Sequence, residues 1–225
     1  MNPEKMVETM EREALKRCAP VYKLKNRLSD PFKILVGAIL STRTRDEETL
    51  KALERLFSEI KDPKDLAKMD VKSIEELIKN VGFYRVKARK LKELAEVIVK
   101  EYNSKIPENF RELLNLPGVG RKVANVFLTE MGYDTIAVDT HVHRIANRLG
   151  IVKAKSVEET EEELKKIFPR SLWRRVNRAF VGFGQTVCKP QKPLCSECPL
   201  SELCKKVGVD AKTSMHSSAE SLQRG

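Results

Sequence analysis

The stretch Leu114-Asn115-Leu116-Pro117-Gly118-Val119-Gly120-Arg121-Lys122-Val123-Ala124 contains the turn that decides how this chain folds. We expect one helix over 108–114 to end before Pro117 and a second helix to begin near Gly120. Pro117 fixes its own φ, while Gly118 and Gly120 permit positive φ and have no Cβ. The backbone can therefore approach a partner closely, and its N–H groups would form a nest for a phosphate oxygen.

A simpler interpretation of the same turn is that Pro-Gly-x-Gly only joins two helices. Arg121 and Lys122 follow the turn at once, and the whole segment LPGVGRK matches the helix–hairpin–helix motif. We therefore interpret the hairpin as a contact with the DNA backbone. The residues predicted to make this contact are Gly118, Val119, Gly120 and Arg121.

Lys122 lies in the first turn of the second predicted helix. The positive end of the helix dipole and partial burial both disfavour a cation there, which increases the fraction of neutral, nucleophilic amine. An amine nucleophile suits attack at the C1′ atom of a sugar, which forms a Schiff base and permits strand cleavage by β-elimination. The alternative, which stays open, is a lysine that only binds phosphate.

Asp139 follows a short apolar stretch and precedes a helix predicted over 142–149. An ionised aspartate is favoured at a helix N-terminus. It could stabilise positive charge that develops on the sugar, or accept a proton from the lysine. The alternative is an ordinary helix N-cap, and the two roles can coexist.

Four of the five cysteines have the spacing Cys188-x6-Cys195-x2-Cys198-x5-Cys204. Four thiolates can hold either zinc or a [4Fe–4S] cluster. Zinc sites commonly use two close pairs, whereas one close pair is flanked here by single cysteines, which favours iron–sulfur. A disulfide framework fits neither this clustering nor the expected compartment. Cys18 stands alone and is expected to pack in an apolar helix.

The chain is strongly basic, with 43 Lys and Arg against 32 Asp and Glu, and this excess favours a polyanionic partner. The charge-rich surface of a thermophilic protein would explain the high content of charged residues but not the imbalance. The N-terminus lacks the apolar core of a signal peptide, and the longest apolar run, 34–40, is too short to cross a bilayer. We therefore expect a soluble, cytoplasmic protein.

Apolar residues at three- and four-residue steps predict helices over 45–60 and 85–102. Another short helix is predicted over 74–81, with Asp70 and Ser73 as caps and Glu76 completing a capping box. No stretch alternates with period two over a useful length, so the expected fold class is all-α. Residues 209–225 are expected to form a flexible tail.

The hairpin, the segment VDTH at 138–141 and the cysteine spacing, in this order, resemble the endonuclease III family of DNA glycosylases over most of residues 20–204. The resemblance identifies the cluster as [4Fe–4S]. It implies two helical domains that flank a DNA-binding cleft. A six-helix barrel domain would span 24–134, and a cluster domain would combine 1–23 with 135–208.

The resemblance also implies the activity, that of a bifunctional glycosylase and AP lyase of base excision repair. It would remove oxidised pyrimidines and cleave 3′ to the abasic site, with Lys122 as the Schiff-base nucleophile and Asp139 as the catalytic carboxylate. Ser41, Asp46 and His141 match family positions around the base pocket. Double-stranded DNA would be bound by a monomer, with a possible monovalent cation at the hairpin.

Two alternatives stay open at this point. One is a monofunctional mismatch or adenine glycosylase, whose members generally carry another residue at the position of Lys122. The other is a non-catalytic DNA-binding module with the same hairpin and cluster. The resemblance also implies that Lys189 and Lys192, in the loop between the first two cysteine ligands, lie beside backbone phosphate.

Members of this family flip the damaged base out of the duplex and fill the gap with side chains from two loops. By resemblance these wedge loops are residues 40–44 and 82–84. Bacterial members usually carry Gln at the position of Arg43 and Leu at the position of Phe83. An arginine can bond the orphaned base or a phosphate, and a phenylalanine can stack. The preferred opposite base is therefore left open.

Overall fold

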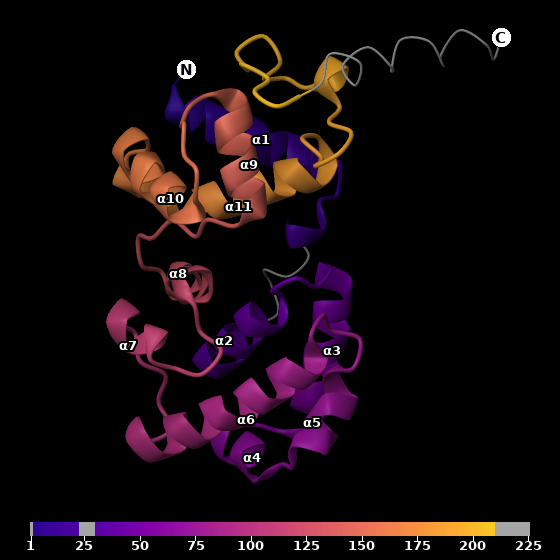
Figure 1. Cartoon of the computed structure of the whole chain (residues 1–225), viewed down its shortest axis with the longest axis vertical. Coiled ribbons are helices and arrows are strands. Elements are labelled where there is room, and N and C mark those ends of the chain that lie inside the picture. Colours follow the sequence, from indigo (N-terminus) through magenta and orange to yellow (C-terminus); the bar gives the residue numbers. More distant parts are fainter. Residues whose placement is uncertain (1, 23–29, 210–225) are drawn as a thin grey trace, which may run out of the picture. The chain divides into compact units, whose positions relative to one another are not determined.

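The computed structural model describes residues 2–22 and 30–209, and every regular element in these ranges is a helix (Figure 1). The predicted all-α fold class is confirmed. By contacts the chain divides into two compact units, Leu24–Thr135 on one side and Met1–Lys23 with Ile136–Gly225 on the other. None of the helices in the described ranges is long and apolar enough to cross a membrane.

The unit Leu24–Thr135 is built around a buried helix. Its helices are α2 (Pro31–Leu40), α3 (Asp46–Glu59), α4 (Pro63–Lys68), α5 (Val71–Ile78), α6 (Tyr84–Glu101), α7 (Phe110–Leu114) and α8 (Arg121–Glu130). The apolar run 34–40 lies in α2 and is buried on all sides, as expected for a helix without a polar face. Helix α2 packs against α3 and α8, while α4 and α5 pack against α6.

The helices predicted from apolar periodicity over 45–60 and 85–102 are confirmed as α3 and α6. The helix predicted over 74–81 begins earlier, at Val71, and ends at Ile78. Asp70 caps it by accepting the N–H of Ser73 at 3.0 Å. Because Ser73 lies inside the helix, the predicted capping box of Ser73 and Glu76 is wrong.

The second unit joins the N-terminal helix to the C-terminal part of the chain. Its elements are α1 (Pro3–Lys16), η1 (Pro20–Tyr22), α9 (Thr140–Leu149), α10 (Val157–Ile167), η2 (Arg170–Leu172), α11 (Trp173–Thr186) and η3 (Cys195–Glu197). Helix α11 packs against both α1 and α9. Helices α1 and α11 approach closely at Gly182, where a Cβ would lie 2.9 Å from the Cβ of Ala14. The missing side chain of Gly182 makes this approach possible.

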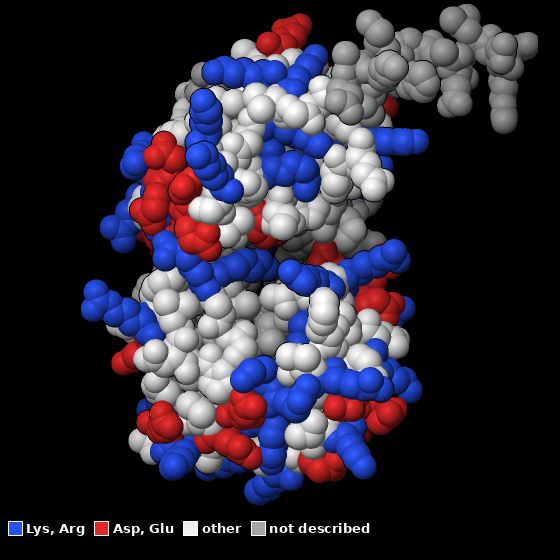
Figure 2. Space-filling view, in the orientation of Figure 1, with Lys and Arg blue, Asp and Glu red and all other residues white. Residues whose placement is uncertain are grey.

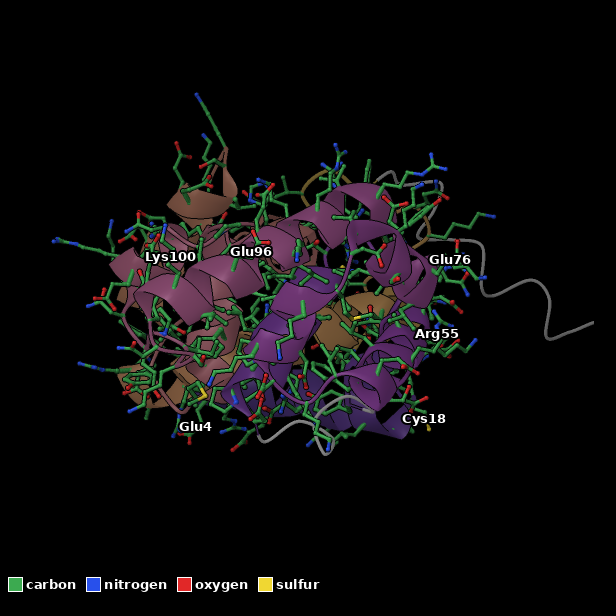
Figure 3. The ribbon with its side chains drawn as sticks, turned by 90° about the horizontal axis from the view of Figure 1, so that it is seen from below. Glu4, Cys18, Arg55, Glu76, Glu96 and Lys100 are labelled. Carbon is green, nitrogen blue, oxygen red and sulfur yellow. The ribbon has the colours of Figure 1, made fainter. Side chains whose placement is uncertain are left out.

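Two expectations concern the ends of the chain. Cys18 follows α1 with a positive φ of 53° and an exposed side chain (labelled in Figure 3), so the prediction that it packs in an apolar helix is wrong. Helix α1 ends at Lys16, which leaves Cys18 in the turn that follows. The predicted tail over 209–225 lies outside the described residues from 210 onward.

Candidate functional site

The hairpin between α7 and α8 has the turn geometry predicted at its first glycine. Gly118 has φ 80°, a conformation that L side chains rarely adopt, and a Cβ there would lie 3.2 Å from the Cβ of Lys90. Val119 closes the turn, since its N–H donates to the Leu116 carbonyl at 3.1 Å and its side chain is buried. Val119 therefore supports the hairpin and presents no side chain to a partner.

Gly120 does not use the positive φ that a glycine permits. It is the N-cap of α8 with φ −99°, which is ordinary extended backbone. A Cβ built on Gly120 would meet no other atom of the described residues within 4 Å. Neither backbone conformation nor packing against the described residues thus requires a glycine here, although glycine is a favoured residue at a helix N-cap.

Arg121 and Lys122 occupy the first turn of α8, and both are half-buried. The Arg121 guanidinium lies 5.4 Å from the ring centroid of Phe110 on α7, which holds it beside the hairpin. Lys122 belongs to the same unit as Lys87, and its positive charge contributes to lowering the pKa of Lys87. The first turn of α8 contains no acidic residue that would compensate these charges.

The two predicted wedge residues contact one another. The Arg43 guanidinium lies 5.5 Å from the ring centroid of Phe83, and the Phe83 side chain is 62% exposed. Both residues have left-handed backbone, with φ 50° and 57°. For a residue other than glycine this conformation costs about 1–2 kcal/mol, so the surrounding contacts must hold it in place.

The segment that carries Arg43 also contains two of the predicted pocket residues. Ser41 caps the C-terminus of α2, and its hydroxyl donates to the Ala38 carbonyl at 2.9 Å. Asp46 is the first residue of α3 and is half-buried. The structure therefore brings Ser41, Arg43 and Asp46 into one connection between two helices. His141, the third predicted pocket residue, belongs to the other unit.

Asp139 is the N-cap of α9, as the capping interpretation predicts. Its Oδ1 accepts the N–H of His141 at 2.9 Å and the N–H of Val142 at 3.0 Å. Because both bonds use Oδ1, the second oxygen takes no part in the cap. The carboxylate is half-buried and held in a fixed orientation by the helix it caps.

Arg144 links α9 to the first cysteine, and the sequence patterns did not single it out. Its Nη2 donates to the Cys188 carbonyl at 2.9 Å and lies 3.2 Å from Nδ1 of His141. Burial lowers the pKa of Arg144, yet a guanidinium stays protonated at any physiological pH. The predicted pocket histidine is thus connected to the cysteine loop through one half-buried cation.

Arg148, four residues further along α9, holds the next part of the same loop. Its guanidinium donates to the Lys189 carbonyl at 2.7 Å and to the Pro190 carbonyl at 2.6 Å. These bonds fix the backbone beside Lys189, while the side chains of Lys189 and Lys192 stay exposed. Two arginines spaced i and i+4 before a cysteine loop are a signal that sequence alone offers, because such residues share one face of a helix.

The four predicted ligands line one apolar cavity together with residues of α9 and α11. The cysteines are Cys188, Cys195, Cys198 and Cys204, and none of them forms a disulfide. Among the described residues, no three His, Cys, Asp or Glu side chains are gathered closely enough for a single metal ion. In a cluster each iron takes one thiolate, so four thiols around one apolar cavity are a suitable set of ligands.

The raised pKa of the thiols in this cavity also indicates that their thiolate forms need a bound cation. Burial raises the pKa of Cys198 to about 11, and the neighbouring thiols of Cys188, Cys204 and Cys195 act in the same direction. Burial likewise raises the pKa of Cys204. Four thiolates in this cavity therefore need positive charge between them, which iron would supply when bound. The residues present fit an iron–sulfur cluster.

Charged side chains are distributed unevenly over the face drawn in Figure 2. Lys and Arg side chains occur over both units, and acidic side chains form one group over α10 and are scattered over the other unit. Helix α10 contains Glu158, Glu159, Glu161, Glu162 and Glu163. Like charges repel, so the surface over α10 disfavours a polyanion, while the hairpin and the cysteine loop carry the exposed and half-buried cations described above.

Comparison with known proteins gives matches over both units. Residues 36–170 match the model of the HhH-GPD superfamily of base excision DNA repair proteins, and residues 188–204 match the iron–sulfur binding domain of endonuclease III. The endonuclease III of Thermotoga maritima is 46% identical over 201 residues, covering 88% of this chain and 92% of that protein. The endonuclease III of Escherichia coli is 33% identical and covers 91% and 96%.

Solved structures give the same result. A trapped covalent intermediate of endonuclease III with DNA is similar with a TM-score of 0.81 and 34% identity, covering 92% of this chain and 97% of that one. A non-covalent complex of endonuclease III with DNA has a TM-score of 0.78 and 36% identity, covering 87% and 94%. The similarity thus extends over nearly the whole fold.

Proposed function

The chain belongs to the endonuclease III family of base excision DNA repair proteins, and from that premise we propose that Lys122 and Asp139 are its reactive residues. The protein is a DNA glycosylase with AP lyase activity that binds DNA and a [4Fe–4S] cluster. What we propose is which side chains carry the reaction and which bases are removed.

One observation carries the assignment of Lys122. It stands in the first turn of α8, directly after a hairpin whose second glycine leaves open space, and a second amine of the same unit, Lys87, is affected by its charge. Like charges and a helix N-terminus both favour a neutral amine. A phosphate held at Gly118 and Gly120 would place an adjacent sugar within reach of that amine.

In the proposed reaction, the Lys122 amine attacks C1′ of the deoxyribose and the bond from C1′ to the base breaks. The base leaves with the bonding electron pair and takes up a proton. The sugar ring then opens to an imine, which makes a C2′ proton acidic. Loss of that proton expels the 3′ phosphate by β-elimination, and water releases the lysine.

Asp139 is proposed to accept the proton from Lys122 and to stabilise positive charge on the sugar. The capping geometry supports this role, because both cap bonds use Oδ1 and the carboxylate is oriented by a helix of ten residues. Asp139→Asn keeps an oxygen for the cap but removes the negative charge. It should therefore lower catalysis far more than stability.

The DNA contacts are proposed to come from both units. The hairpin backbone at Gly118 and Gly120 and the Arg121 guanidinium would hold one stretch of phosphate. The exposed Lys189 and Lys192 would hold another, with their loop fixed by Arg148. The two units would correspond to the predicted barrel domain and cluster domain. A monovalent cation at the hairpin stays a prediction.

The proposed substrates are oxidised pyrimidines in double-stranded DNA, bound by a monomer in the cytoplasm. Ser41, Asp46 and His141 would surround the extruded base, and Arg43 with Phe83 would fill the gap in the duplex. Support for the wedge role comes from the 62% exposure of Phe83 and its contact with Arg43. Sedimentation of the free protein and of its DNA complex tests the monomer.

Borohydride trapping tests the reactive pair. The intact protein should form a covalent adduct with duplex DNA that contains an abasic site or thymine glycol, and Lys122→Ala should form none. Lys92→Ala is the matched control, because Lys92 is a half-buried lysine of the same unit that bonds the Ala67 carbonyl, away from the hairpin. Base release without any adduct from the intact protein would indicate a monofunctional glycosylase and reject Lys122 as nucleophile.

A further inference from the structure

Lys87 is the one nearly fully buried lysine among residues 2–22 and 30–209, with 8% of its surface exposed. It lies on α6 in the apolar stripe that includes Leu91 and Ala95. A buried ammonium is costly, and an apolar residue of similar length would pack there without that cost. Within the part of the chain that the structure describes, the Lys87 ammonium bonds two carbonyls and one hydroxyl and no carboxylate. Its presence therefore points to what those bonds hold.

The Lys87 ammonium holds the first wedge loop on both sides of Arg43. Its Nζ donates to the Leu40 carbonyl at 2.9 Å, to the Thr42 carbonyl, and to the Thr44 hydroxyl at 3.1 Å. All three donors of the ammonium are used. The Leu40 carbonyl ends α2, where carbonyls lack partners within the helix and the helix dipole favours a cation.

The same residue reaches the second wedge loop. The Thr44 hydroxyl that Lys87 bonds also accepts the N–H of Gly82 at 3.1 Å. The two loops approach so closely that a Cβ on Gly82 would lie 2.3 Å from the Arg43 carbonyl oxygen. The backbone N–H of Lys87 donates to the Phe83 carbonyl at 3.0 Å. One residue thus bonds backbone next to both wedge side chains.

These contacts explain how Arg43 and Phe83, which touch one another, both keep a left-handed backbone conformation. Arg43 and Phe83 each have an unfavourable φ, and an exposed loop would relax from it without support. We propose that Lys87 is the positioning residue that joins residues 40–44 and 82–84 into a single rigid wedge, so that base extrusion from a duplex depends on it. This inference rests on the wedge role proposed above for Arg43 and Phe83.

The test separates base extrusion from amine chemistry. Lys87→Met keeps the length of the side chain and removes the three bonds. We expect single-turnover release of thymine glycol from duplex DNA to fall roughly ten- to hundred-fold, the scale of a reacting geometry displaced by about 1 Å. Borohydride trapping on a single-stranded abasic oligonucleotide, which needs no wedge, should stay within about two-fold of the intact protein. An equal loss on both substrates would overturn the proposal and place the effect at Lys122 instead.

Lys92→Met is the matched control for burial of a lysine. Lys92 lies on the same helix, bonds the Ala67 carbonyl and pairs with Glu96 (labelled in Figure 3), on a part of α6 away from both wedge loops. It should leave the ratio of duplex to single-stranded activity unchanged. A change of that ratio as large as in Lys87→Met would show that any lysine removed from α6 has this effect, and would overturn the proposal.

A double-mutant cycle gives a result that loss of stability cannot mimic. In an Arg43→Ala, Phe83→Ala background the wedge is already absent, so adding Lys87→Met should reduce duplex activity by no more than about two-fold. A further loss equal to that in the intact background would overturn the proposal.

Should Lys87→Met fold poorly, Thr44→Val removes only the hydroxyl that Lys87 and Gly82 share. It should lower the same ratio by a smaller factor, and an unchanged ratio counts against the proposal.

The outcome is distinguishable from failure of the proposed function. If the intact protein traps no abasic DNA, single- or double-stranded, the reactive pair is wrong whatever Lys87 does. If trapping depends on Lys122 but Lys87→Met lowers both substrates alike, only the inference about Lys87 is wrong.

Discussion

In the wedge loops of one unit and in the cysteine loop of the other, side-chain cations bond backbone carbonyls. The two regions differ in whether a bound cluster is needed to hold their shape. Lys87 donates to two carbonyls before Arg43 and to the Thr44 hydroxyl after it, and Arg144 and Arg148 donate to carbonyls around Cys188. The wedge loops also contact one another through the protein backbone. The cysteine loop surrounds a cavity whose buried thiols repel each other as thiolates. The first region is therefore expected to hold its shape unaided, and the second only with its cluster.

Loss of the cluster should separate the two regions most strongly. Cys198→Ser removes the ligand that is buried among the other three and should abolish stoichiometric iron binding. Amide hydrogen exchange of the full chain should then accelerate at least a hundred-fold over 188–204 and stay unchanged over 40–44. Cys18→Ser, which alters an exposed cysteine outside the cavity, is the control. Equal acceleration in both regions would show that they are not independent.

The pH dependence of stability tests the buried ammonium of the first region. Burial, together with the charge of Lys122, lowers the pKa of Lys87 from 10.5 to about 8. Between these values the unfolded chain binds more protons than the folded chain, so the free energy of unfolding contributed by this group rises with pH. Relative to Lys87→Met, the intact protein should gain up to about 3 kcal/mol between pH 7 and 11. Urea unfolding at several pH values measures this gain. If the free energy of unfolding changed with pH equally in both proteins, the lowered pKa of Lys87 would be contradicted.

Contact between the wedge loops can be broken by one methyl group. Gly82→Ala places a Cβ 2.3 Å from the Arg43 carbonyl, so the backbone must move, at a cost of about 1–3 kcal/mol in urea unfolding. Gly120→Ala adds the same methyl where no atom of the described residues lies within 4 Å. It should cost less than about 1 kcal/mol of stability yet weaken binding to duplex DNA. If Gly82→Ala lowered the free energy of unfolding as little as Gly120→Ala, the two loops could move apart at little cost.

The smallest effect is expected where the cysteine loop meets α9. Arg148→Lys keeps the positive charge but replaces the guanidinium by an ammonium. The two guanidinium nitrogens that bond the Lys189 and Pro190 carbonyls are thereby lost. Duplex affinity should fall several-fold, about 1 kcal/mol, while iron content stays unchanged. Fluorescence anisotropy with an undamaged duplex measures the first quantity. Unchanged affinity would mean that the cluster alone shapes the loop.

Sequence patterns predicted the parts of this molecule that depend on local rules. The helices α3 and α6 follow from apolar periodicity, and the hairpin and cysteine loop from motifs whose spacing is fixed by chemistry. The errors are also local. Ser73 was expected to cap a helix that begins before it, and Cys18 was expected to pack in a helix that ends before it.

The residues that no pattern indicated act over long sequence distances. Lys87 holds carbonyls more than forty residues earlier, and Arg144 bonds a carbonyl forty-four residues later. Their partners are backbone atoms, which every residue possesses, so no side-chain pairing marks them in the sequence. The available hint was a lysine in the apolar stripe of α6, where the periodicity expects a hydrophobic residue.

The open space at Gly120 has a consequence for how mutations here would be detected. Because an added side chain meets no atom of the described chain, a screen for folding, expression or thermal tolerance would pass most substitutions at this position. Because we propose that Gly120 contacts DNA, we expect a screen that scores survival after DNA damage to reject them. On the proposed contact between Gly120 and DNA, a survey that ranks variants by their effect on stability would miss the changes at Gly120 that weaken DNA binding.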